Sequence, residues 1–259
     1  MALNPPIRQW QGLRVWIIGA SEGIGAALVS KLAAQGARLA LSARHEQSLR
    51  AVAAHAQAPD ALILPLDVTD APALEAAMAQ IIATWGGVDL VLHVAGTYTP
   101  MRADRMDLEA ALRLTDINIG GVYKMLAAVL PQLHAQGHGA LGLVGSIAGY
   151  SGLPKALAYG PSKAALINLC EALYLDMHPK GLGVYMISPG FVRTRLTTGN
   201  DFKMPALIDA DQAADYILRG IARGDFDIHF PKRFSTFLKF LRLLPYRLYF
   251  ALLQKVAVP

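Results

Sequence analysis

Tyr159 and Lys163 are the residues in this chain whose types and spacing point most directly to chemistry. They are four positions apart, so on a helix both side chains lie on one face. A phenol with its ordinary pKa of about 10 is a weak acid–base catalyst at neutral pH. We expect the neighbouring ammonium group to favour the phenolate and so to lower the pKa of Tyr159. The pair can then exchange a proton with a substrate oxygen.

Ser146 lies thirteen residues before Tyr159, at the end of an apolar run that reads as a strand. Its hydroxyl can hydrogen-bond the same substrate oxygen and orient a carbonyl or an alcohol. A Tyr-x-x-x-Lys pattern by itself is also typical of a surface pair on an amphipathic helix. The elements that position the three side chains must decide between the two interpretations.

Short apolar runs alternate with helical segments along the chain. Strands are expected at residues 13–19, 37–43, 62–66, 88–94, 140–146 and 183–188, and helices at 26–35 and 71–84. Apolar runs of this length, bounded by Gly, Pro or Asp, suit strands that are buried on both faces. Alternation with helices indicates parallel pairing through right-handed crossovers. The predicted fold class is therefore α/β, a Rossmann-like doubly wound parallel sheet that binds ligands at the carboxyl ends of its strands.

The first strand runs into a turn whose glycines, Gly19, Gly23 and Gly25, are spaced Gly-x-x-x-Gly-x-Gly. Glycine lets the backbone turn tightly and approach a pyrophosphate closely. The helix that follows points its free N–H groups at the same place. Between a buried strand and a helix, such a turn indicates a dinucleotide site. Cofactor contacts are expected from Gly19, Ser21, Glu22, Gly23, Ile24 and Gly25.

The glycine spacing and the motifs that follow it, over roughly residues 13–195, resemble the short-chain dehydrogenase/reductase family. The motifs that match are Asp67, Ala95-Gly96, Asn118, Ser146 with Tyr159 and Lys163, and Pro189-Gly190 with the residues to Thr194. The chain departs from the family at three positions. His93 and Val94 stand where the family has asparagines, and Ile18 stands where it has a threonine. In the family, the threonine and the second asparagine, at the positions of Ile18 and Val94 here, tie the central strands together, so their loss concerns local rigidity and not the chemistry.

The resemblance implies hydride transfer between a nicotinamide and a carbonyl or secondary alcohol. The implied catalytic tetrad is Asn118, Ser146, Tyr159 and Lys163. In the family the asparagine holds a water that links the lysine to solvent, and the lysine also holds the nicotinamide ribose. Further implied cofactor contacts, besides Tyr159 and Lys163, are Asp67, Val68, Ala95, Gly96, Pro189, Gly190, Val192 and Thr194. No metal site is expected.

The end of the second strand points to NADP(H) as the cofactor. NAD-binding proteins place an acidic residue there to bind the ribose 2′-hydroxyl, whereas this chain has Ala43 followed by Arg44. A guanidinium binds a 2′-phosphate bidentately, and Ser21 and Ser42 can add hydroxyl groups. Glu22 points the other way, because many NADP-dependent relatives carry a basic residue at that position.

The positive charge of the chain is concentrated at its C-terminal end. Residues 228–259 hold six basic residues and no acidic one, which leaves 18 basic against 19 acidic residues for the rest of the chain. A balanced body argues against nucleic-acid binding. The single cysteine excludes an internal disulfide framework and a cysteine-based zinc cluster. We therefore predict one NADP-binding catalytic domain at 1–227 and a basic, aromatic, amphipathic extension at 228–259.

The extension has helical periodicity on both sides of Pro245. One apolar stripe consists of Phe234, Phe237, Leu238, Leu241 and Leu244, with Lys239 and Arg242 on the opposite side. This composition is typical of a helix that lies in a membrane interface. The alternative is a helix that packs on the body or on a second subunit. The sequence thus predicts a cytoplasmic homodimer or homotetramer whose extension contacts a membrane surface or a subunit.

The expected substrate pocket has few fixed charges. Its walls are predicted from the loop at 195–208 and from Thr97, Tyr98, Ala148, Tyr150, Leu153 and Leu157. Such walls suit an apolar, lipid-like ketone or alcohol. One alternative is a 3-oxoacyl-thioester reductase that uses the extension for oligomer contacts. Another is a non-enzymatic NADP-sensing or membrane-surface protein, which would not need the intact Ser146, Tyr159 and Lys163 set.

Overall fold

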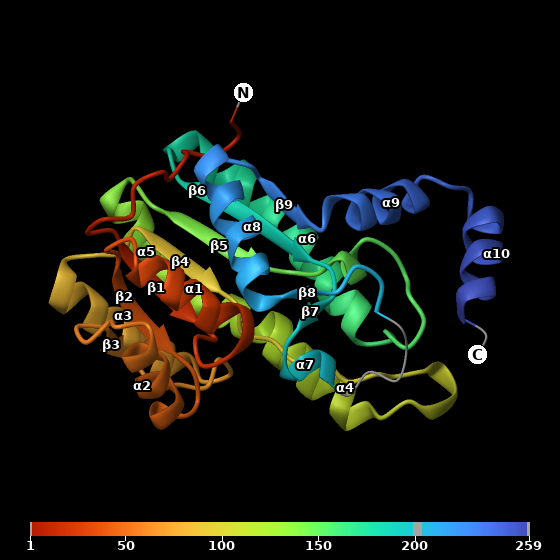
Figure 1. Ribbon diagram of the computed structural model, residues 1–259, viewed down its shortest axis with the longest axis horizontal. Helices are drawn as coiled ribbons and strands as arrows, with labels where there is room; N and C mark the ends of the chain where they lie inside the picture. The colour runs from red at the N-terminus through yellow and green to blue at the C-terminus, as the bar shows by residue number, and fades with distance from the viewer. Residues whose placement is uncertain (1, 199–203, 258–259) are drawn as a thin grey trace.

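The computed structural model describes residues 2–198 and 204–257, and its centre is a parallel sheet (Figure 1). Seven strands lie in the order β3-β2-β1-β4-β5-β6-β9, all paired in parallel. They are β1 (Arg14–Ile18), β2 (Arg38–Ser42), β3 (Leu62–Ile63), β4 (Leu90–His93), β5 (Ala140–Val144), β6 (Gly183–Pro189) and β9 (Asp227–Phe230). A separate pair joins β7 (Val192–Arg193) to β8 (Ile208–Asp209). The predicted Rossmann-like sheet is confirmed.

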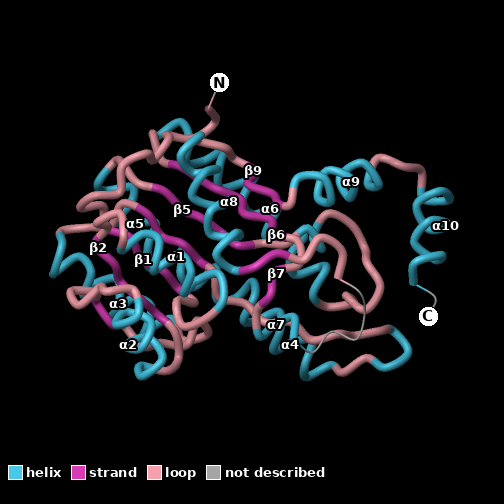
Figure 2. Tube along the Cα trace, in the orientation of Figure 1, coloured by secondary structure: helices cyan, strands magenta, loops and turns pink. Residues whose placement is uncertain are grey.

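Helices flank the strands on both faces, as Figure 2 shows. One face carries α1 (Gly23–Ala33), α2 (Glu46–His55) and α8 (Ala210–Arg223), and the other carries α3 (Ala71–Trp85), α5 (Gly121–Gln136) and α6 (Tyr159–Met177). Shorter helical elements are α4 (Leu108–Thr115), the π-helical turn Asp116–Gly120, and α7 (Arg195–Thr198). The chain ends in α9 (Lys232–Arg242) and α10 (Tyr246–Ala257).

Burial on both faces explains why the strands read as unbroken apolar runs. In β4, Leu90 and Leu92 pack in the cluster with α1 and α8, while Val91 packs in the cluster with α3, α5 and α6. Side chains that alternate across a strand therefore all meet apolar neighbours. The six strands expected from the sequence are present, and most are shorter than predicted by one to three residues at their ends.

The seventh strand, β9, was not expected, and it crosses the predicted boundary between 1–227 and 228–259. Its Ile228 pairs in register with Ile187 of β6, and both Ile228 and Phe230 are buried. Four residues that alternate apolar with polar give only a weak strand signal. The helical part of the extension begins at Lys232.

The extension is attached to the body and is not independent of it. Leu238, Leu241 and Tyr249 are buried in the same core cluster as α3, α5 and α6. Lys239, expected on the side of the helix opposite the apolar stripe, forms an ion pair with Asp227 of β9 that the sequence did not predict. Helical spacing defines the faces of α9, but the carboxylate that attracts Lys239 comes from another element. No helix in the described chain is both long and apolar enough to span a membrane.

Candidate active site

A groove of about 1830 Å³ opens at the carboxyl ends of the central strands. At one end the glycine-rich turn and Arg44 line it, and at the other end Phe237 of α9 does. Ser146 and Tyr159 line it as well. This is the edge at which doubly wound sheets bind their ligands.

The glycine-rich turn is built so that only glycine fits. Gly19 has a φ of +92°, and a Cβ there would lie 2.5 Å from the backbone nitrogen of Ala95. A Cβ on Gly25 would collide with the carbonyl oxygen of Gly19. Gly25 does not line the groove itself; its role is to let α1 approach the turn. The result is a stretch of exposed backbone at the start of α1, suited to an anionic group.

The other expected cofactor residues line the groove along its length. They are Gly19, Ser21, Glu22, Gly23, Ile24, Arg44, Asp67, Val68, Ala95, Gly96, Tyr159, Lys163, Pro189, Gly190, Val192 and Thr194. Backbone bonds join β1 to β4 at this edge, because the nitrogens of Val94 and Ala95 both donate to the carbonyl of Ile18, at 2.8 and 3.0 Å. The main chain therefore ties the end of β1 to the segment that follows β4.

Arg44 lines the groove just past the end of β2. The carboxylate of Asp67 lies nearby. Burial acts to raise the pKa of Asp67, but hydrogen bonds from Thr69 and the charge of Arg44 lower it overall. Ser42 does not contribute: it is fully buried and accepts a hydrogen bond from Trp16 Nε1 at 2.9 Å. The expectation that the hydroxyl of Ser42 contributes to cofactor binding is therefore wrong, whereas Ser21 does line the groove.

Glu22 reaches across the groove instead of pointing along it. Its carboxylate lies 3.3 Å from Nε of Arg195, at the start of α7. Beside it, a Cβ on Gly23 would lie 2.9 Å from Cγ2 of Thr194. The glycine-rich turn and the segment after Gly190 therefore meet and form two facing walls.

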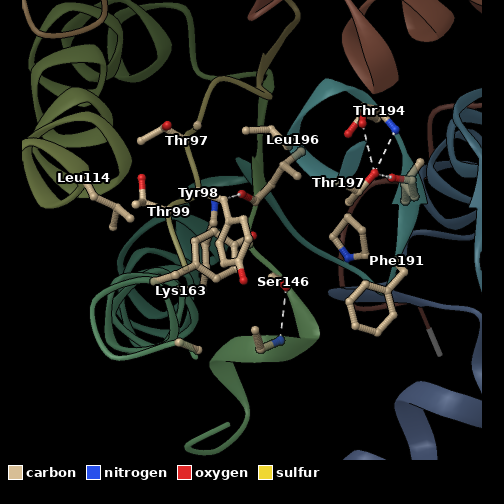
Figure 3. A pocket seen from close by; sticks show the side chains of 18 of the residues that line it. Thr97, Tyr98, Thr99, Leu114, Ser146, Lys163, Phe191, Thr194, Leu196 and Thr197 are labelled. Carbon is tan, nitrogen blue, oxygen red and sulfur yellow. Dashed lines mark hydrogen bonds between the residues drawn. The ribbon is translucent and has the colours of Figure 1, made fainter. Parts of the chain in front are cut away.

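Ser146, Tyr159 and Lys163 form the floor of the groove. Ser146 follows β5, and Tyr159 is the first residue of α6, with Lys163 one turn later. Tyr159 hydrogen-bonds Ser146, and Nζ of Lys163 lies 5.7 Å from the centroid of the Tyr159 ring. Figure 3 shows Ser146, Lys163 and Tyr98 gathered in the centre of the site. The rings of Tyr98 and Tyr159 pack edge to face, with their centroids 5.0 Å apart.

Burial dominates the electrostatics of this floor. It raises the pKa of Tyr159 to about 12, against the opposing effect of the hydrogen bond with Ser146. Burial also lowers the pKa of Lys163 to about 8. The net shift of the Tyr159 pKa in the protein alone is therefore upward, because burial outweighs the effects that favour the phenolate. At neutral pH the phenol keeps its proton, and Lys163 is mostly charged.

Asn118 lies beneath the groove, in the π-helical turn, and is 1% exposed. Its Oδ1 accepts from the backbone nitrogen of Thr97 at 2.8 Å, and its Nδ2 donates to Thr97 O at 3.0 Å and to Ser162 Oγ at 3.1 Å. Ser162 in turn donates to the carbonyl of Tyr159 at 2.8 Å. Asn118 therefore connects the loop after β4 with the first turn of α6.

The expected substrate walls are present in part. Thr97, Tyr98, Ala148 and Leu153 line the groove, as do Arg195, Leu196, Thr197 and Pro205. Tyr150 and Leu157 do not. Tyr150 is buried with the ammonium of Lys239 5.3 Å from its ring centroid, and Leu157 is 41% exposed. Gly199, Phe202 and Lys203 of the predicted loop lie outside the described residues.

The largest omission from the sequence prediction is a wall made by the C-terminal helices. Residues of α9, α10 and the turn between them line the groove: Phe234, Phe237, Leu238, Phe240, Leu241, Leu244, Leu252 and Leu253. A hint existed in the sequence, since seven of the twenty aromatic residues fall between 230 and 250. Helical spacing alone does not say which surface such a segment covers.

Comparison with known proteins agrees with this geometry. The family model described as short chain dehydrogenase matches residues 14–204. The chain belongs to the short-chain dehydrogenase family. Short-chain dehydrogenases are oxidoreductases, and the resemblance seen in the sequence is confirmed at the level of the family.

Individual relatives cover most of the chain. An oxidoreductase of Myxococcus xanthus is 36% identical over 93% of this chain and 96% of its own length. The 3-oxoacyl-acyl-carrier-protein reductase of Escherichia coli is 30% identical over 73% of this chain and 77% of its own length. Among solved structures, a short-chain dehydrogenase from Burkholderia cenocepacia in complex with NADP superposes with a TM-score of 0.83. It is 23% identical and covers 95% of this chain and 99% of its own, so this likeness concerns the fold.

Proposed function

We propose that this protein is an NADP(H)-dependent oxidoreductase that transfers hydride between nicotinamide and the carbonyl or secondary alcohol of an apolar, lipid-like substrate. One observation carries the proposal. Ser146, Tyr159 and Lys163 meet on the floor of a groove that has a glycine-rich turn at one end and apolar walls at the other. A nucleotide site and an apolar site thus share one acid–base group.

The residues present fit a nicotinamide dinucleotide phosphate. The turn at Gly19 leaves backbone open where a side chain would collide, which suits a pyrophosphate. Arg44 would hold the 2′-phosphate, Asp67 and Val68 would lie beside the adenine, and Lys163 would hold the nicotinamide ribose. The NADP-bound relative in the same fold supports this assignment. When bound, the nicotinamide supplies or accepts the hydride.

The floor residues then have separate roles. Tyr159, with its pKa raised to about 12, keeps its proton at neutral pH and donates it to the carbonyl oxygen during reduction. Ser146 binds the same oxygen and orients it. The ammonium of Lys163 stabilises the phenolate that forms. Asn118 and Ser162 hold the first turn of α6 in place through the hydrogen bond to the carbonyl of Tyr159.

A 3-oxoacyl-thioester reductase is the second candidate, favoured by the similarity to the Escherichia coli enzyme. It shares the reaction and differs in the part of the substrate that is recognised. A non-enzymatic NADP-sensing protein would bind the nucleotide without turnover. Simple ketones, an acyl-carrier thioester and NADPH alone, assayed side by side, discriminate the three.

We further propose that the outer face of the extension rests on an anionic lipid surface. Leu243, Tyr246 and Leu248 are more than half exposed there, and Arg242 and Arg247 are also exposed. Apolar and basic side chains together favour such an interface. Sedimentation with anionic vesicles should pull down the full chain and leave it in solution with neutral vesicles. A vesicle-independent dimer or tetramer that covers these residues would instead assign the face to subunit contact.

The test of the proposed reaction is the oxidation of NADPH, followed at about 340 nm, with aliphatic, steroid and 3-keto lipid carbonyls. We expect turnover with apolar ketones. Tyr159→Phe should lower kcat by about a thousandfold, because the proton donor is lost, while NADPH binding measured by fluorescence titration stays within about twofold. Near-normal turnover in Tyr159→Phe would remove the basis of the mechanism.

A further inference from the structure

We infer that the C-terminal helices α9 and α10 form a subsite for the hydrocarbon chain of the substrate, beyond the reacting carbonyl. This inference rests on the proposed function and adds to it the place and the chemistry of substrate recognition. The observations that carry it are the extent of the groove, the residues on its C-terminal wall and the contacts that fix that wall.

The groove is larger than one ligand needs. Pockets for one drug-sized ligand are about 300–1,000 Å³, whereas this groove measures about 1830 Å³. It runs without interruption from Gly19 and Arg44, past Tyr159, to Leu252. A dinucleotide at the glycine-rich end therefore leaves space on the far side of Tyr159 for a second extended molecule.

The C-terminal wall is entirely apolar. Each of the eight groove-lining residues from α9, α10 and the turn between them is Phe or Leu. None of these side chains can form a hydrogen bond or an ion pair. A wall of this kind recognises hydrocarbon and offers nothing to a polar headgroup, a sugar or a phosphate.

Several of these wall residues expose apolar surface that a ligand would cover. Phe237, Phe240 and Leu252 are 55%, 60% and 46% exposed, yet all three line the groove. Leu243 and Leu248, on the same two helices, are 79% and 57% exposed and do not line it. The exposed apolar residues thus divide into an inner set, continuous with Tyr159, and an outer set.

The wall is held in place before any ligand arrives. Leu238 and Leu241 of α9 are buried in the core, and Phe234 stacks on Phe191 with ring centroids 6.1 Å apart. In α10 the hydroxyl of Tyr249 donates to the carbonyl of Gly152. Fixed walls spare a bound chain part of the cost of ordering the protein, so binding should increase steadily with chain length.

The test measures kcat/KM for NADPH-dependent reduction of methyl ketones from butanone to hexadecanone. We expect a rise of about twofold to fourfold per added methylene until the subsite is filled. Phe237→Ser and Leu252→Ser should lower kcat/KM for hexadecanone by about tenfold or more and leave butanone within about twofold. Leu175→Ser on α6 and Tyr123→Ser on α5, at exposed apolar positions that do not line the groove, are the matched controls, and they should keep kcat/KM for both ketones within about twofold of the unchanged protein.

Binding without turnover gives an independent readout. Parinaric acid, a fluorescent fatty acid, should bind once per chain, be displaced by hexadecanone, and bind more weakly to Phe237→Ser and Leu252→Ser than to the controls.

Different outcomes refute different claims. Reduction of butanone without any gain from longer ketones would overturn the subsite and leave the proposed reaction standing. Equal losses in the groove variants and in the controls would overturn it too, because the loss would then not come from the apolar wall. If no ketone of any length oxidises NADPH but parinaric acid binds as described, the reaction is wrong and the subsite stands.

Discussion

The two ends of the groove are built on different principles. At the glycine-rich end, backbone approaches backbone so closely that a single Cβ on Gly19 would lie 2.5 Å from the nitrogen of Ala95. At the C-terminal end, the wall consists of Phe and Leu side chains, of which Phe237, Phe240 and Leu252 are about half exposed. The first arrangement depends on main-chain geometry and tolerates almost no change. The second depends on the amount of apolar surface and tolerates many substitutions of similar size.

This contrast suggests how one scaffold serves different substrates. The floor that carries Ser146, Tyr159 and Lys163 belongs to the rigid end, because it is formed where β5 and α6 meet. The apolar wall is added by elements that follow the last strand, β9. Substitutions should therefore have steep effects on cofactor binding and catalysis at one end, and graded effects on stability and substrate choice at the other.

Among the changes that test this contrast between the two ends, the largest loss of cofactor affinity is expected at the turn. Gly19→Ala should lower NADPH affinity by about a hundredfold, because relieving the clash with Ala95 must displace the backbone that faces the pyrophosphate. Gly86→Ala is the matched control. Gly86 also has a positive φ, +75°, but a Cβ there meets no atom within 4 Å. The Gly86→Ala variant should lose about 1 kcal/mol of unfolding free energy and keep its affinity for NADPH. Equal affinities for the two variants would contradict the contrast.

The second largest effect is expected at Arg44, on the preference for NADPH over NADH. Arg44→Ala removes charge-assisted hydrogen bonds to a 2′-phosphate, each worth about 1.5–3 kcal/mol. We expect kcat/KM with NADPH to fall about tenfold to a hundredfold, with little change for NADH. Arg50→Ala, on α2, removes an exposed arginine paired with Glu46 that does not line the groove, and should alter neither value. A clear preference of the unchanged protein for NADH would refute the assignment.

The dependence of stability on pH tests the burial of His93, which lies at the rigid end of the groove. It is 2% exposed at the end of β4, and within the described chain its Nε2 has no hydrogen-bond partner. Burial, with a smaller effect of Lys163, lowers its pKa to about 3. The folded chain therefore binds fewer protons than the unfolded chain between about pH 6.5 and that value, so stability falls as pH falls through this window. From pH 6.5 to 5 the loss due to His93 is about 2 kcal/mol.

His93→Asn should abolish that part of the acid loss, measured by urea unfolding at both pH values. His229, whose pKa burial lowers to about 4, remains in the variant and continues to contribute its own part of the stability lost at low pH. His55→Asn, at an exposed position on α2, is the control and should retain the full loss. An unchanged acid loss in His93→Asn would show that this histidine is not buried as a neutral group.

The smallest effect is expected at the anchor of the C-terminal wall. Lys239→Met removes the ion pair with Asp227, in which both side chains are partly exposed, and should cost about 1 kcal/mol of unfolding free energy. NADPH affinity should not change. Arg242→Met, on the same helix but exposed, should leave stability within about 0.5 kcal/mol. A large loss of cofactor affinity in Lys239→Met would show that the two ends are coupled.

The same contrast separates what the sequence could reveal from what it could not. The turn at Gly19 and the Tyr159–Lys163 pair are local patterns with fixed spacing, so they were identified without a structure. The seventh strand was missed because four residues are too few to establish a period. The ion pair of Lys239 was not foreseen because its partner, Asp227, comes from another element. The pKa of Tyr159 was misjudged because burial is a property of the folded chain.

The bond from Tyr249 to the carbonyl of Gly152 links the last helix to the segment that joins Ser146 to Tyr159. The last helix is therefore hydrogen-bonded to the loop whose two ends carry Ser146 and Tyr159. We therefore expect tags, fusions or truncations at this terminus to affect this loop. An assay on a shortened chain would report on a loosened reaction centre and not merely on a missing appendage.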